Sequence, residues 1–161
     1  MVFLGGPDDR EALAYATRMA EHPTIRLTVL RIIAVGEHSD NLTEKRLDMN
    51  AINDFRISTI DKKRIVYKEE GVTGAAGTTR VVTSLDTDDY ELILVGRRHD
   101  SESPLVNGLA EWKEIEELGV IGDMLGSSDF KSKASVLVVQ QQALVVEEMV
   151  ESQRFIAKQL Q

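Results

Sequence analysis

The segment LILVGRRHDSESPLVNGLAEWKEIEELGVIGDMLGS, residues 92–127, joins a short apolar run to a long polar, glycine-rich continuation. A continuous apolar run is typical of a strand that is covered on both faces of a sheet. The run ends at Gly96, and Arg97, Arg98 and His99 follow it directly. Open α/β sheets bind ligands at the carboxyl ends of their strands. The segment therefore predicts a buried strand followed by a recognition surface.

Length and composition describe one globular domain. The chain has 161 residues, of which 42% are hydrophobic, and this is enough for a substantial core. No apolar run approaches the roughly 20 residues of a membrane span, and the opening MVFLGGPDDR does not read as a signal peptide. The absence of cysteine excludes disulfides and cysteine-ligated metals. A net charge of −8 argues against nonspecific binding to nucleic acid or anionic lipid.

Apolar strands and amphipathic helices alternate along the chain. Strands are expected at 2–4, 26–35, 64–68, 91–95 and 135–139, and helices after Gly5-Gly6-Pro7, at 41–59, at 73–85 and around 122–128. Parallel neighbours need such long connections, and their crossovers are right-handed. The sequence therefore predicts a doubly wound α/β fold, with a five-stranded parallel sheet covered by helices on both faces.

Capping residues mark the starts of the first two helices. We expect Asp8 or Asp9 to cap the first helix, and Asn41 or Thr43 to cap the second. Beyond the α/β domain, expected at 1–142, residues 143–161 predict an additional C-terminal helix with an apolar stripe. That stripe packs either on the sheet of its own chain or on a second copy.

Catalytic and metal-binding patterns are not expected. The three histidines, His22, His38 and His99, lack metal-ligand spacing, and we interpret His99 as a solvated loop residue. Asp8 and Asp9 stand where a dinucleotide-binding turn would have glycines, and two acids at a helix start repel phosphate. The sequence therefore predicts a protein that is not an enzyme, with no catalytic residue, no metal site and no cofactor.

The paired arginines that follow the fourth strand are stronger candidates for binding. Arg97 and Arg98 favour either an anionic ligand or internal salt bridges, because guanidinium groups bind carboxylates and phosphates. The internal partners would be nearby glutamates: Glu111, Glu114, Glu116 and Glu117. We expect Trp112, with Ile115 and Leu118, to anchor this acidic segment on the core.

Two strings of the sequence resemble one family closely. GGPDDREAL and GLAEWKEIEELGVIGD are similar to the C-terminal cytosolic tail of plant CHX-type cation/proton antiporters of the CPA2 class, and the resemblance covers 2–142. The chain resembles the second half of that tail. The resemblance implies a regulatory domain at the cytosolic face of a plasma membrane or endomembrane, acting in K⁺ and pH homeostasis. Its implied partners are the membrane domain and the first half of the tail in the same polypeptide, with a homodimer as a further possibility.

The predicted fold also resembles universal stress protein domains, some of which bind ATP through glycines that follow strand four. Gly96 matches the first glycine of that motif, and Gly126 with Ser127 matches its last pair, whereas His99 stands at the middle glycine. The ligand-binding residues implied are Gly96, Arg97, Arg98, His99, Gly126 and Ser127. The alternatives to a regulatory antiporter tail are a sensor that binds ATP or AMP, and a dimerisation module built on the Trp112 segment or the C-terminal helix.

Overall fold

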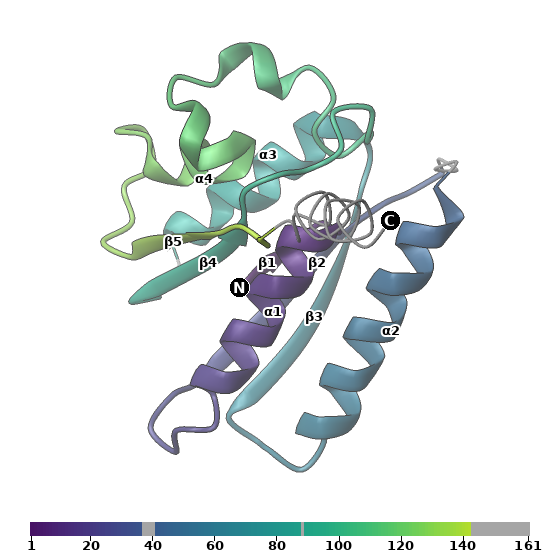
Figure 1. The fold of residues 1–161 in the computed structure, drawn as a ribbon. Coiled ribbons are helices and arrows are strands. Elements are labelled where there is room, and N and C mark those ends of the chain that lie inside the picture. The colour runs from purple at the N-terminus through teal and green to yellow at the C-terminus, as the bar shows by residue number, and fades with distance from the viewer. Residues whose placement is uncertain (37–40, 88, 143–161) are drawn as a thin grey trace, which may run out of the picture.

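The computed structural model describes residues 1–36, 41–87 and 89–142 (Figure 1). Its strands are β1 (Val2–Phe3), β2 (Leu27–Ala34), β3 (Ile65–Val72), β4 (Leu92–Gly96) and β5 (Ser135–Val139). Its helices are α1 (Pro7–Met19), α2 (Leu42–Thr59), α3 (Gly74–Ser84) and α4 (Gly119–Gly126), with short 3-10 turns at Leu85–Thr87, Leu109–Trp112 and Glu116–Leu118. The alternation of strands and helices confirms the α/β class. The expected C-terminal helix at 143–161 lies outside the described residues.

The strands form two parallel ladders, β1-β2-β3 and β4-β5. The expectation of a single five-stranded sheet is therefore not confirmed. Strand β1 lies beside β4 but does not pair with it. The physical reason is that β1 has only two residues, and the next backbone nitrogens, of Leu4 and Gly5, donate to the carboxylate of Asp9 instead of to a strand.

Helices cover both faces of this layer of strands, as the sequence predicts (Figure 1). Alternate strand residues point to opposite faces. Phe3 and Val29 belong to one buried cluster together with residues of α1 and α2, whereas Val2 and Ile32 belong to another with residues of α3 and α4. The two cores place the carboxyl ends of β1, β4 and β5 close to the start of α1.

Of the two predicted helix caps, the structure confirms the one for α2 and not the one for α1. The side chain of Asn41 accepts a hydrogen bond from the backbone nitrogen of Glu44 at 3.1 Å, which confirms it as the cap of α2. The capping prediction for Asp8 and Asp9 is wrong, because α1 begins at Pro7 after Gly6 and has no side-chain cap. Among the described residues, no helix has both the length and the apolar character required to cross a membrane.

Candidate functional site at the carboxyl ends of the strands

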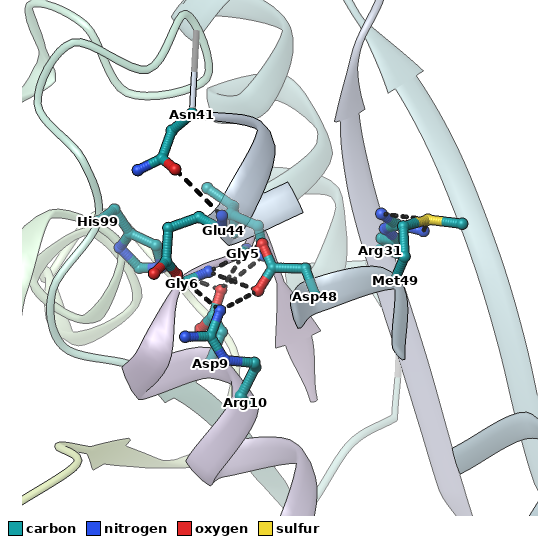
Figure 2. A network of polar contacts seen from close by, with 11 residues as sticks. Gly5, Gly6, Asp9, Arg10, Arg31, Asn41, Glu44, Asp48, Met49 and His99 are labelled. Atoms are coloured by element: carbon teal, nitrogen blue, oxygen red, sulfur yellow. Dashed lines mark hydrogen bonds and ion pairs between the residues drawn. The ribbon is translucent and has the colours of Figure 1, made fainter. Parts of the chain in front are cut away.

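The turn between β1 and α1 depends on two glycines. Gly5 and Gly6 adopt φ angles of 122° and 97°, a region that glycine enters at little cost. A Cβ atom on Gly5 would lie 2.6 Å from Oδ2 of Asp48. The bare backbone lets this α2 carboxylate accept a hydrogen bond from the nitrogen of Gly6 at 3.1 Å (Figure 2). The turn is thereby held against α2.

Asp9 is fully buried and connects the ends of β1 and β4. Its Oδ2 accepts hydrogen bonds from the backbone nitrogens of Leu4 and Gly5, at 2.6 and 2.9 Å. Its Oδ1 accepts one from the backbone nitrogen of Gly96 at 2.8 Å. A Cβ atom on Gly96 would lie 2.4 Å from that same oxygen, so the close approach requires glycine. Gly96 therefore serves the packing of Asp9 against β4.

Asp8, also fully buried, binds Arg98 in two ways. Its Oδ2 accepts from both the backbone nitrogen and Nε of Arg98, and its Oδ1 accepts from a terminal guanidinium nitrogen at 2.7 Å. The backbone nitrogen of Gln141, just after β5, adds a fourth donor at 2.9 Å. Burial acts to raise the pKa of Asp8, but Arg98 and these backbone donors hold the pKa below its ordinary value. Asp8 thus ties the ends of β4 and β5 to α1.

His99 pairs with the buried carboxylate of Asp9. Its Nε2 lies 3.2 Å from Oδ2 of Asp9, and its side chain is only 4% exposed. The prediction of a solvated loop histidine is therefore wrong. Burial acts to lower the pKa of His99, but the negative charges of Asp9 and Asp8 raise the pKa above its ordinary 6.5. The other ring nitrogen, Nδ1, is buried and has no hydrogen-bond partner among the described residues.

Arg10 extends the network from α1 to α2. One of its terminal nitrogens lies 2.5 Å from Oδ1 of Asp48 and 2.8 Å from Oε2 of Glu44 (Figure 2). Asp48 thus has two functions, since it holds the glycine turn and also pairs with Arg10. The two α2 carboxylates share this single guanidinium charge.

A cavity of about 530 Å³ opens beside this network. The glycine turn, the carboxyl end of β2, the start of α2 and the segment after β4 form its walls. His99 and Arg98 line it together with Asp100, Ser103 and Pro104. The cavity lies at the carboxyl ends of parallel strands, where α/β proteins bind ligands.

The predicted binding residues fall into two places. Gly96 to His99 lie at the end of β4, next to the buried acids, and Arg98 and His99 reach the first cavity. Gly126 and Ser127 line a separate cavity of about 500 Å³ between α4 and the acidic segment. Arg97 does not line the first cavity, and a terminal nitrogen of its side chain donates to Oε1 of Gln140 at 2.7 Å.

The paired arginines make internal contacts, but not with the predicted partners. Arg98 binds Asp8 instead of a glutamate of the acidic segment. That segment is held by Asp123 of α4, whose carboxylate accepts hydrogen bonds from the backbone nitrogens of Glu114 and Ile115 at 3.0 and 2.9 Å. The Ile115 side chain is half exposed, so Ile115 does not contribute to the expected apolar anchor. The side chain of Trp112, which the same prediction names, is not among the side chains that the structure describes.

Sequence reasoning missed the roles of Asp8, Asp9 and Asp48. The first two read as helix-terminal residues, and Asp48 reads as one polar residue of an amphipathic helix. A usable signal lies in their positions, because Asp8 and Asp9 follow a proline at the helix start. Acids inside the first turn, with no cap role to fill, are free to accept hydrogen bonds from other segments.

The comparisons with a family model and with individual relatives both match this chain to plant cation/H(+) antiporters. A family model described as "Plant cation/H(+) antiporter, C-terminal domain" matches residues 1–140. Cation/H(+) antiporter 26 of Arabidopsis thaliana is 45% identical over 152 residues, which cover 92% of this chain and 19% of the relative. Cation/H(+) antiporter 15 of the same plant is 44% identical over 159 residues, covering 88% of this chain and 19% of the relative. The chain thus spans about a fifth of the length of these curated relatives.

Other matches extend the comparison. Cation/H(+) symporter 13 of Arabidopsis thaliana is 46% identical over 142 residues, covering 88% of this chain and 17% of the relative. Among solved structures, hypothetical protein MJ0577 is similar with a TM-score of 0.50 at 16% identity, over 88% of this chain and 94% of that chain. This likeness shows a shared universal-stress-protein-like fold and nothing about ligands.

Proposed function

The chain belongs to the family of plant cation/H(+) antiporter C-terminal domains, and from this premise we propose that it is a non-catalytic regulatory domain of a K⁺/proton antiporter. The observation that carries the proposal is the family match over residues 1–140. The domain would lie at the cytosolic face of the membrane, in one polypeptide with the antiporter domain and the first half of the tail. Its role would be in K⁺ and pH homeostasis, and ion transport would take place in the membrane domain.

The buried network supports a regulatory role. Asp8 and Asp9 bind groups at the ends of β1, β4 and β5. Their oxygens are committed to backbone nitrogens, a guanidinium and an imidazole. Such a network fixes the position of the segment after β4 relative to α1. A signal that alters the network changes the surface that the domain offers to the rest of the transporter.

We expect the sensing surface to consist of Gly96 at the end of β4, the three residues after it, Arg97, Arg98 and His99, and Gly126 with Ser127. The test uses the full-length antiporter, because transport belongs to the whole polypeptide. K⁺ and proton fluxes are measured in vesicles for the wild type, for a deletion of this domain and for an Arg97→Ala/Arg98→Ala variant. Exposed Arg26 supplies the control, Arg26→Ala, and immunoblots match the amount of transporter in each sample.

The proposal expects the deletion and the double variant to change the rate or pH dependence of transport without changing ion selectivity. The Arg26→Ala variant should behave as the wild type. Unchanged transport in the double variant would reject the sensing surface. Unchanged transport after deletion of the domain would reject the regulatory function itself.

A second candidate function is a sensor that binds ATP or AMP. The cavity of about 530 Å³ at the strand ends favours it, because its position suits a small ligand. Apart from His99, the charged residues that the structure describes in its wall are three acids and three bases, so they give it no net positive charge to attract phosphate. These residues are Glu44, Asp48, Asp100, Arg31, Lys45 and Arg98. Calorimetry with ATP, AMP, NAD and NADH tests this candidate. Absence of both heat and thermal stabilisation at millimolar nucleotide would reject it.

A further inference from the structure

His99 occupies an unusual place for an ionisable side chain. It is almost completely buried, and Nε2 contacts Oδ2 of Asp9, while Nδ1 is buried without a partner among the described residues. His99 also lines the first cavity. An imidazole that has one carboxylate contact and no competing hydrogen bond on the other nitrogen can gain or lose a proton without rearranging its ring.

The charged groups around the cavity show which charge the imidazole faces. These groups are Asp8 and Asp9 on α1, Arg31 on β2, Glu44, Lys45 and Asp48 on α2, and Arg98 and Asp100 in the segment of His99 itself. Arg98 offsets the charge of Asp8. Arg10 pairs with both Asp48 and Glu44, so its single charge offsets one of these two carboxylates. Among the described residues, Asp9 has no cationic partner except His99.

The backbone shares part of the charge of Asp9. Three backbone nitrogens, those of Leu4, Gly5 and Gly96, donate to its carboxylate. The positive end of the α1 dipole also stabilises this carboxylate and opposes a protonated imidazole. Both effects limit how strongly His99 holds its proton, which keeps the proton exchangeable.

We propose that His99 is a proton-binding site whose occupancy controls how firmly the segment 98–104 is held over the first cavity. With the proton bound, an imidazolium donates a charge-assisted hydrogen bond to Asp9. When the proton leaves to solvent, the donor of the remaining hydrogen bond to Asp9 is a neutral imidazole, so this bond is weaker. The buried group of Asp8, Asp9 and Arg98 then carries an uncompensated negative charge.

The direction of titration agrees with this geometry. The pKa of His99 is raised above its ordinary 6.5 by Asp9 and Asp8, despite the opposing effect of burial. The stabilisation is therefore fully present below pH 6.5 and is lost as the pH rises through the folded-state pKa. Alkaline pH should loosen the cavity wall formed by Arg98, His99, Asp100, Ser103 and Pro104.

The inference rests on the proposed function only for its consequence in transport, since the proton equilibrium belongs to the domain itself. The first experiment is an NMR titration of the imidazole signals in the 161-residue chain. A His22→Gln/His38→Gln variant leaves His99 as the single imidazole of the chain, so its signal is assigned directly. The ordinary histidine pKa of 6.5 serves as the reference.

We expect His99 to titrate above the ordinary histidine pKa of 6.5. We also expect the amide hydrogens of Gly96, Arg98 and His99 to exchange faster, relative to their intrinsic rates, once the pH exceeds the pKa of His99. Titration of His99 at or below pH 6.5 would overturn the inference. So would amide protection that is the same on both sides of the transition.

A second experiment separates the switch from the proposed function. Transport by the full-length antiporter is measured across pH for the wild type and for His99→Gln. A shifted pH profile supports both the switch and the regulatory function. A raised NMR pKa with amide loosening, combined with an unshifted transport profile, upholds the proton site and counts against the regulatory function.

Discussion

The carboxylate of Asp9 lies 2.8 Å from the backbone nitrogen of Gly96, which is 87 residues further along the chain. This contact joins β1 and β4, two neighbouring strands that share no ladder hydrogen bonds. The other carboxylate oxygen accepts from Leu4 and Gly5 at the end of β1. One side chain therefore connects the two parallel ladders at their carboxyl ends.

The Asp9→Asn variant should destabilise the domain by about 3 kcal/mol, because an amide nitrogen would face backbone donors and His99 would lose its counter-charge. Urea unfolding followed by circular dichroism measures the loss. Glu11→Gln, at an exposed position of the same helix, is the matched control and should stay within about 0.5 kcal/mol of the wild type. A loss below about 1 kcal/mol for Asp9→Asn would contradict the connecting role of the carboxylate.

Substitution by alanine should have different effects on stability at two glycines of the predicted binding surface, Gly96 and Gly126. A Cβ atom on Gly96 would lie 2.6 Å from the backbone nitrogen of Asp9, and backbone cannot move aside easily. Gly96→Ala should therefore cost about 3 kcal/mol or prevent folding.

Within the part of the chain that the structure describes, a Cβ atom on Gly126 would meet only Leu118 Cδ1, at an ordinary 3.5 Å. Gly126→Ala, at the end of α4, should be neutral or stabilising by up to about 1 kcal/mol. Thermal and urea unfolding check both variants. Equal effects of the two substitutions would show that the contact with Asp9 does not explain why position 96 is glycine.

Local patterns were sufficient to predict most elements of the fold. The apolar run SVLVV predicts a strand at 135–139, and β5 has these bounds. The helix expected at 41–59 is α2, with Asn41 as its cap. These features depend on residues close in sequence, where hydrophobic period and capping chemistry apply directly.

The site depends on contacts that no local pattern contains. Asp8 and Arg98 are separated by 90 residues, as are Asp9 and His99. Two acids in a first helical turn also suit the helix dipole, so their sequence position alone cannot distinguish a surface role from a buried one. The polar neighbours of His99, Asp100 and Ser101, indicate a loop, whereas its burial is determined by Asp9 across the fold.

The Arg98→Met variant tests the pairing with Asp8 through its dependence on pH. The folded-state pKa of Asp8 is lowered, so its stabilising contribution is present above pH 3.8 and is lost as the pH falls through that pKa. Without the guanidinium of Arg98, only the backbone donors oppose the effect of burial, so the pKa of Asp8 rises and its ionised form is less stabilised. The free energy of unfolding of the variant should be about 1 kcal/mol lower than that of the wild type at neutral pH. This effect is modest because the Arg98 side chain is 49% exposed and its charge is screened by water.

The difference in free energy of unfolding between the wild type and Arg98→Met should become smaller on acidification, because a protonated Asp8 has no charge for the guanidinium to stabilise. Unfolding in urea at pH 7, 5 and 3 gives the comparison. Arg97→Met removes the surface contact with Gln140, and its free energy of unfolding should show a small and pH-independent change. A pH-independent gap for Arg98→Met would mean that the arginine acts through packing instead of charge.

The acidic segment should depend on Asp123 for its order. Its carboxylate accepts hydrogen bonds from the backbone nitrogens of Glu114 and Ile115, and Asp123→Ala leaves both donors to solvent. We expect a loss of about 1–2 kcal/mol in stability and several-fold faster cleavage by a glutamate-specific protease within 111–117. Asp129→Ala is the control, since Asp129 is exposed after α4. Cleavage of Asp123→Ala at the wild-type rate would mean that other contacts hold the segment against α4.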